Sequence, residues 1–182
     1  YAKSHSETSP LAVVTGKPVE LGGCAARLEA TGRGVAIMLR EYCKLKKIDP
    51  KTLRVAVQGF GNVGYHAVRI ISSELGSKIV GISNAISAIE NQDGIDVEAA
   101  KKIEQEHADD LSKLADTKSI KRDDLLMVDC DDLIPAALAN AITKEVAEKT
   151  NATVLLEAAN SPTTPEANDI LYYKGVFIAP SI

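Results

Sequence analysis

Short apolar segments alternate with segments of helical periodicity along most of the chain. In the helical segments apolar residues recur at spacings of three and four, whereas the apolar segments are continuous and only four to six residues long. Continuous apolar runs of this length are typical of parallel strands buried on both faces. The predicted strands span residues 53–58, 78–83, 132–135, 153–157 and 176–179, and the predicted helices span 30–47, 66–75, 97–107, 143–149 and 165–174.

This alternation predicts an α/β fold with a doubly wound parallel sheet of the Rossmann type, because crossovers between parallel strands are right-handed. Thr164 followed by Pro165 is a strong helix start signal. A short strand at 11–15 and a short helix at 122–126 are also expected, and residues 1–10 are polar enough to form an entry linker. The length of 182 residues indicates one domain spanning 1–182.

The most informative motif is the GxGxxG sequence at 59–64, which follows a predicted strand and precedes a predicted helix. In dinucleotide-binding proteins each glycine of this motif has its own role. Gly59 would permit the tight turn, Gly61 would let a pyrophosphate approach the backbone, and Gly64 would let the helix pack against the strand. The motif therefore predicts binding of NAD or NADP, while a purely structural turn and a methyl-donor site remain alternatives.

The residue that selects between NAD and NADP is expected about 20 residues after the turn, at the end of the second strand. That position is Asn84, where NAD sites usually carry a carboxylate for the ribose 2′-hydroxyl. An amide can bind a hydroxyl and does not repel a 2′-phosphate. We therefore expect the site to accept both coenzymes, unless Asn84 serves only the turn; residues 83–91 contain no Lys or Arg that would make it specific for NADP.

Composition narrows the range of functions. The net charge is −4 and aromatic residues make up 4% of the chain, which argues against a general nucleic-acid binder or an anionic-membrane binder. No apolar run approaches the length of about 18 residues that a transmembrane helix needs. Three scattered cysteines favour a reducing, cytoplasmic compartment over a disulfide framework. The isolated histidines and adjacent aspartates have no metal-ligand spacing, so no metal site is expected, and Cys130 is expected to be a buried apolar thiol.

Several motifs resemble, in the same order, those of hexameric glutamate dehydrogenases. The similarity extends over nearly the whole chain, and leucine and phenylalanine dehydrogenases share the fold but resemble residues 59–64 and 163–167 less closely. The resemblance implies NAD(P)-dependent oxidative deamination of L-glutamate to 2-oxoglutarate and ammonia. The motifs are TGKP at 15–18, GG at 22–23, EATGRG at 29–34, VAVQGFGNVG at 55–64, NQDGID at 91–96, IPAAL at 134–138 and EAANSPTTPEA at 157–167.

The resemblance also implies roles for single residues in coenzyme binding. Thr31 matches the threonine that holds the nicotinamide carboxamide, and Asn160 matches the asparagine near the nicotinamide ribose. Ala136 and Ala137 match residues on the nicotinamide side. Simpler roles stay open for all four: a helix cap for Thr31, a loop contact for Asn160 and packing for the alanines. The pyrophosphate would be held by the turn residues Phe60, Asn62 and Val63.

The sequence departs from the family pattern at five positions. Cys24 and Ala26 replace a usual serine and glycine, and Asn84 replaces the common acidic residue. Ser161 and Ser181 replace a usual glycine and aspartate. Asn84 leaves the coenzyme preference open, and Ser161 is adjacent to the expected nicotinamide contact.

The family's glutamate-binding and catalytic lysines and its catalytic aspartate belong to a separate substrate domain ahead of this one. The chain carries neither that domain nor the returning C-terminal helices, and it begins with Tyr1 rather than Met. We therefore expect binding of coenzyme without turnover, with no catalytic residue in this chain, and a hexamer in the full-length enzyme. The competing interpretation is a stand-alone nucleotide-sensing module.

Overall fold

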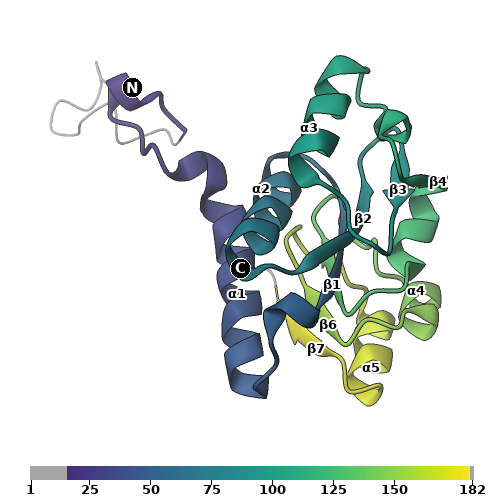
Figure 1. The fold of residues 1–182 in the computed structure, drawn as a ribbon. Helices are drawn as coiled ribbons and strands as arrows, with labels where there is room; N and C mark the ends of the chain where they lie inside the picture. The colour runs from purple at the N-terminus through teal and green to yellow at the C-terminus, as the bar shows by residue number, and fades with distance from the viewer. Residues whose placement is uncertain (1–15, 181–182) are drawn as a thin grey trace, which may run out of the picture.

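The computed structural model describes residues 16–180, which form a seven-stranded sheet with helices on both faces (Figure 1). The strand order is β4-β3-β2-β1-β5-β6-β7. The linker expected at 1–10 and the strand expected at 11–15 lie outside the described residues. The strands are β1 (Arg54–Gln58), β2 (Lys78–Ser83), β3 (Ala88–Glu90), β4 (Lys118–Ile120), β5 (Asp132–Pro135), β6 (Val154–Leu156) and β7 (Phe177–Ala179).

Five α-helices connect or flank the strands, together with shorter helical turns. The predicted helices are confirmed, but α1 begins at Arg27 and α2 begins at Asn62, inside the glycine motif. The apolar pattern did not show the first turn of α2, because Asn62 and Gly64 in this turn do not contribute to a helical pattern of apolar residues. The helices are α1 (Arg27–Lys46), α2 (Asn62–Ile70), α3 (Val97–Glu106), α4 (Lys144–Lys149) and α5 (Pro165–Tyr173), and the short turns are η2 (Val19–Leu21), η3 (Pro50–Thr52), η4 (Ile71–Leu75), η5 (Leu111–Lys113) and η6 (Arg122–Met127).

The sheet is parallel from β2 to β7, as the sequence predicts, but its other edge is antiparallel. β2 pairs antiparallel with β3, and β3 pairs antiparallel with β4. The five strands that the sequence predicts are confirmed as parallel, and two strands that it does not predict extend the sheet at this edge. Neither added strand is a continuous apolar run, because β3 ends in Glu90 and β4 begins with Lys118 and Ser119.

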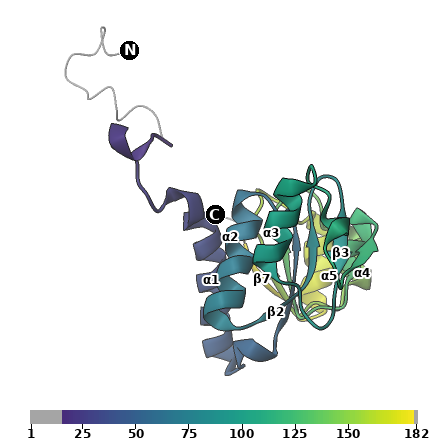
Figure 2. The ribbon, with the colours of Figure 1, turned by 45° about the horizontal axis from the view of Figure 1, so that its top comes forward.

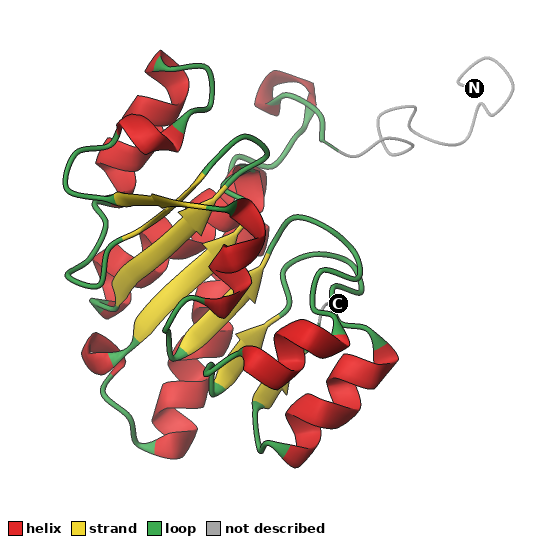
Figure 3. Cartoon of the chain, turned by 90° about the vertical axis from the view of Figure 1, so that its right-hand side faces the viewer, coloured by secondary structure: helices red, strands yellow, loops and turns green. Residues whose placement is uncertain are grey.

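The two faces of the sheet are covered by different helices, as Figures 2 and 3 show. Val55 and Val57 of β1 pack with residues of α1, α2 and α3, whereas Ala56 between them packs with η6, α4 and α5. Side chains on both faces of the sheet are buried, which explains why the strands consist of continuous apolar residues. None of the helices between residues 16 and 180 is long and apolar enough to cross a membrane.

Candidate functional site

The glycine turn lies at the carboxyl ends of the parallel strands, where the chain order reverses between β1 and β5. Gly59 continues β1 and donates its N–H to the carbonyl of Ser83 in β2, at 2.8 Å. On the other side, Ala136 N donates to the carbonyl of Gln58 at 2.7 Å. The turn is thus fixed between β2 and β5, at the edge where open α/β sheets bind ligands.

The three glycines have three different surroundings. Gly59 has a φ of 99°, in the left-handed region that favours glycine. At Gly64 a Cβ would lie 1.8 Å from the carbonyl oxygen of Gly59, so the helix and the turn could not approach this closely with any other residue. At Gly61, by contrast, a Cβ would meet no protein atom within 4 Å. The space above Gly61 is therefore open, as a pyrophosphate contact requires.

Helix α2 begins at this open space. Its first helical hydrogen bond runs from Tyr65 N to the carbonyl of Gly61, at 2.9 Å. The N–H groups before Tyr65 have no partner within the helix, and the N-terminal end of the helix carries a partial positive charge. Both properties favour an anion at this position.

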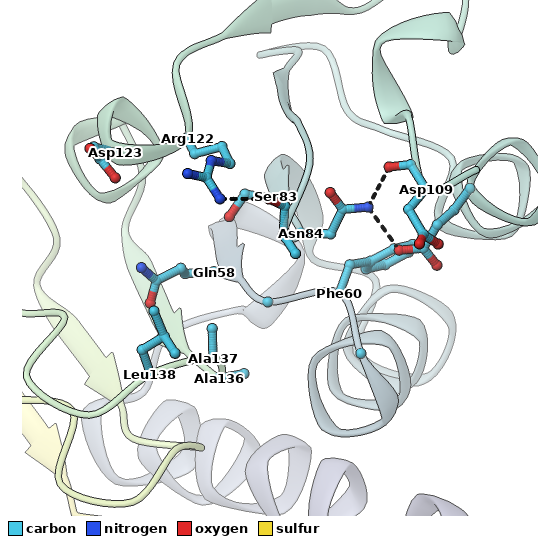
Figure 4. Close-up of a pocket in the computed structure, with 14 residues that line it drawn as sticks. Gln58, Phe60, Ser83, Asn84, Asp109, Arg122, Asp123, Ala136, Ala137 and Leu138 are labelled. Carbon is cyan, nitrogen blue, oxygen red and sulfur yellow. Dashed lines mark hydrogen bonds between the residues drawn. The ribbon is translucent and has the colours of Figure 1, made fainter. Parts of the chain in front are cut away.

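A cavity of about 520 Å³ lies on one side of the turn (Figure 4). It extends from the glycines to the carboxyl end of β2 and to the start of η6. A volume of this size is typical of small-molecule sites. The lining residues are Gln58, Gly59, Phe60, Gly61, Ser83, Asn84, Ala85, Glu104, Asp109, Arg122, Asp123, Ala136, Ala137 and Leu138.

A second cavity of about 520 Å³ lies on the other side of the turn. It brings Thr31 of α1, Val63 of α2 and Asn160 of the loop after β6 to one place. Ala136, Ala137 and Leu138 line both cavities, so the two are adjacent, and together they are called the groove below. The groove joins the two sets of residues that the sequence assigns to the two halves of a dinucleotide.

The structure limits what several of these side chains can do. Phe60 is fully buried, beneath the Nζ of Lys101 at 5.4 Å, so only its backbone can face a ligand. Asn62 donates its Nδ2 to the carbonyl of Leu28 at 2.8 Å, which ties the start of α2 to α1. Thr31 is the fifth residue of α1 and is exposed, so the alternative of a helix cap is wrong.

The side chain of Asn84 forms several hydrogen bonds that hold together the loop after β2. Its Nδ2 donates to Glu104 Oε1 at 3.0 Å and to the carbonyl of Asp109 at 2.7 Å. Its Oδ1 accepts from the backbone N–H groups of Ile86 and Ser87, each at 2.9 Å. Both amide hydrogens are therefore used within the protein. The turn-supporting role that the sequence left open for Asn84 is present in the structure.

Four charged residues of the cavity were not found from the sequence. Glu104 comes from α3, Asp109 from the turn after it, and Arg122 and Asp123 from η6. They lie 20 to 39 residues after Asn84, and no motif marks them. Only the return of α3 and η6 to the end of β2 brings them together, so a local sequence pattern could not have indicated them.

Ser161, beside Asn160, has a φ of 47°. This left-handed conformation favours glycine, the residue that the family pattern has at this position. The serine therefore keeps the glycine-type backbone. Asn160, the residue before it, is exposed and lines the second cavity.

Other candidate groups lie outside the groove. Cys130 is buried, and burial raises the pKa of its thiol to about 12, as expected for an inert apolar thiol. Burial also raises the pKa of Asp132, whose carboxylate oxygens have no hydrogen-bond partner. Among residues 16–180 no three His, Cys, Asp or Glu side chains are grouped as metal ligands would be.

The groove has the chemistry that a dinucleotide requires. It offers an open backbone and a helix N-terminus at its centre, and an apolar wall of Ala136 and Ala137. One buried acceptor, Gln58 Oε1, lines the first cavity without a hydrogen-bond partner in the described part of the chain. An unpaired buried acceptor is costly unless a ligand or water satisfies it.

A family model described as Glutamate/Leucine/Phenylalanine/Valine dehydrogenase matches residues 22–182. The chain belongs to this dehydrogenase family. The sequence resemblance and the α/β fold class are thereby confirmed.

Individual relatives of the chain include glutamate dehydrogenases. The enzyme of Thermotoga maritima is 46% identical over 94% of the chain, and the NAD-specific enzyme of Clostridioides difficile is 42% identical over 96%. The crystal structure of the hetero-hexameric glutamate dehydrogenase of Thermus thermophilus has a TM-score of 0.87 at 28% identity and covers 99% of the chain. That of Peptoniphilus asaccharolyticus has a TM-score of 0.79 at 35% identity over 99% of the chain. The chain spans 41% to 42% of the length of these relatives.

Proposed function

We propose that residues 1–182 are the coenzyme-binding domain of an NAD(P)-dependent glutamate dehydrogenase. The single observation that carries the proposal is the groove, in which the open backbone at Gly61 lines the first of two adjacent cavities of about 520 Å³ each. Family membership supports the reaction class, and the glutamate dehydrogenases among its relatives favour glutamate over leucine or phenylalanine as substrate.

The residues of the groove have distinct roles in this proposal. The N–H groups of Asn62, Val63 and Gly64 at the start of α2 bind the pyrophosphate. Gly59 and Gly61 keep the backbone clear for it, and the backbone of Phe60 lies against it. The adenosine half lies in the first cavity, beside Asn84. The nicotinamide half lies in the second cavity, against Thr31, Ala136, Ala137 and Asn160.

A bound nicotinamide would supply the hydride acceptor for oxidation of the substrate. The chain's part in this step is to hold the ring at the mouth of the second cavity and to shield one side of it with Ala136 and Ala137. Hydride transfer also needs a substrate held against the ring and a base beside it. We propose that a separate substrate domain supplies both, so this chain binds coenzyme without turnover.

The proposal also covers the choice between NAD and NADP, the oligomeric state and the cellular compartment. Asn84 places no carboxylate at the end of β2, so both NAD and NADP are bound. The full-length enzyme is a hexamer in the cytoplasm. Cys24, Cys43 and Cys130 of this chain are free, which fits a reducing compartment.

Titration of the purified chain with NADH and with NADPH, followed by coenzyme fluorescence, tests the proposal. We expect saturable binding of both, with dissociation constants within about a hundredfold of each other. Absence of binding for both coenzymes would refute the coenzyme-domain proposal. Tight binding of NADH with an NADPH affinity more than about a hundredfold weaker would refute only the dual preference.

A further inference from the structure

The first cavity contains a cation that the glycine motif does not predict. Arg122, at the start of η6, is the only Lys or Arg among the described residues that line this cavity. Figure 4 shows its guanidinium directed toward Ser83 and Asn84, at the carboxyl end of β2. This is the place where a dinucleotide fold receives the adenosine ribose.

The guanidinium of Arg122 retains most of its binding capacity. Its Nη1 donates to the carbonyl of Ala85 at 2.5 Å, which fixes the side chain on the loop after β2. Within residues 16–180, no carboxylate lies within ion-pair distance of it. An arginine has five N–H donors in a planar fork that suits a phosphate. The remaining donors are available to a ligand.

The acidic residues of the cavity are placed differently. Glu104 is 6% exposed, and its carboxylate accepts hydrogen bonds from Lys101 Nζ and Asn84 Nδ2, so its charge is compensated inside the protein. Asp109 lies on the opposite side of Asn84 from Arg122 in Figure 4. Asp123 is adjacent to Arg122 in η6, on its far side from Asn84. Asp109 and Asp123 oppose a phosphate, and Arg122 attracts one.

From this arrangement we infer that Arg122 is the specificity-determining residue that lets the site accept the 2′-phosphate of NADP. The inference rests on the proposed coenzyme function and deepens it. Asn84 is then a supporting residue: it keeps a carboxylate away from the ribose and holds Glu104 in place. The cation that receives the phosphate comes from η6, about 40 residues further along the chain.

The test compares the dissociation constants of NADH and NADPH for Arg122→Gln. We expect NADPH affinity to fall about 10- to 100-fold, the range for losing charge-assisted hydrogen bonds, with NADH affinity unchanged. Lys121→Gln is the matched control. It removes the same charge at the neighbouring residue, whose side chain does not line the cavity. It should leave the NADPH to NADH ratio unchanged. Arg122→Lys should restore part of the NADPH affinity.

Two further measurements isolate the phosphate. Adenosine 2′,5′-bisphosphate and adenosine 5′-monophosphate differ only at the 2′ position, so the Arg122→Gln loss should appear with the former alone. Asp123→Asn should strengthen NADPH binding severalfold relative to NADH, because it removes a repelling charge.

The outcomes separate the two proposals. If NADH binds and Arg122→Gln leaves the NADPH to NADH ratio unchanged, the role of Arg122 is refuted and the coenzyme function stands. The same holds if the wild-type chain binds NADH and shows no affinity for NADPH. If neither coenzyme binds, both proposals are refuted together.

Discussion

Two glycines of the same turn should respond to substitution in opposite ways. Gly61→Ala places a methyl group in open space, so we expect the fold to remain stable while coenzyme affinity falls by about tenfold or more. Gly64→Ala places the methyl group 1.8 Å from the carbonyl oxygen of Gly59, so we expect a loss of stability of several kcal/mol. Denaturant unfolding and NADH titration of both variants distinguish the effects. Unchanged NADH affinity in a folded Gly61→Ala variant would contradict the pyrophosphate position.

Adjacent aspartates at the start of β5 provide a second contrast. Burial raises the pKa of Asp132 well above 3.8, so the folded chain holds a proton that the unfolded chain releases. Between pH 3.8 and the raised pKa, the free energy of unfolding therefore decreases as pH rises. Asp132→Asn lacks this decrease. It should match the wild type near pH 4 and be more stable than the wild type at pH 7.

The control for that measurement is Asp131→Asn. Asp131 Oδ2 accepts from Arg54 N at 2.8 Å and from Arg54 Nε at 3.2 Å, so this variant should lose stability instead. Chemical unfolding at pH 4, 5.5 and 7 gives both profiles. A stability difference between Asp132→Asn and wild type that does not change with pH would show that Asp132 is not protonated by burial.

Helix α1 carries Thr31, which lines the second cavity. The position of α1 depends on one close contact with α2. At Gly32 a Cβ would lie 2.6 Å from Ala67 N in α2, so Gly32→Ala must push the helices apart. We expect a loss of about 1–3 kcal/mol. Because Thr31 moves with α1, NADH affinity should fall as well.

Gly34 in the same helix is the matched control. A Cβ there meets nothing within 4 Å, so Gly34→Ala should gain about 0.5–1 kcal/mol from helix propensity. Thermal unfolding of the two variants measures both effects. Equal stabilities for the two variants would contradict the close packing of α1 on α2.

At the level of elements, the sequence predicted the five parallel strands and the helices between them, because burial on both faces leaves a continuous apolar pattern. It did not predict β3 and β4, which depend on tertiary pairing, β3 with β2 and β4 with β3, rather than on their own three residues. The same limit applied to the site. Local chemistry identified the glycine turn, whereas Glu104 and Arg122 reach the cavity only through tertiary folding.

For the molecule as a whole, we expect binding without catalysis. The described residues provide both halves of a coenzyme groove, and we place the base and the substrate site in a separate domain. The purified chain should therefore bind NADH yet show no glutamate-dependent reduction of NAD or NADP. Absorbance at the wavelength of reduced nicotinamide measures this directly. Detectable turnover would show that this chain holds catalytic residues of its own.

At Gly64 and Gly32 the backbones of the turn, α2 and α1 approach one another closely. Backbones in direct contact leave little room for relative movement. The distance between the glycine turn and Thr31 at the nicotinamide end is therefore set during folding, before any ligand arrives. Binding should be nearly rigid-body on the protein side, and a dinucleotide with a shortened or lengthened bridge should be rejected even if both of its bases fit.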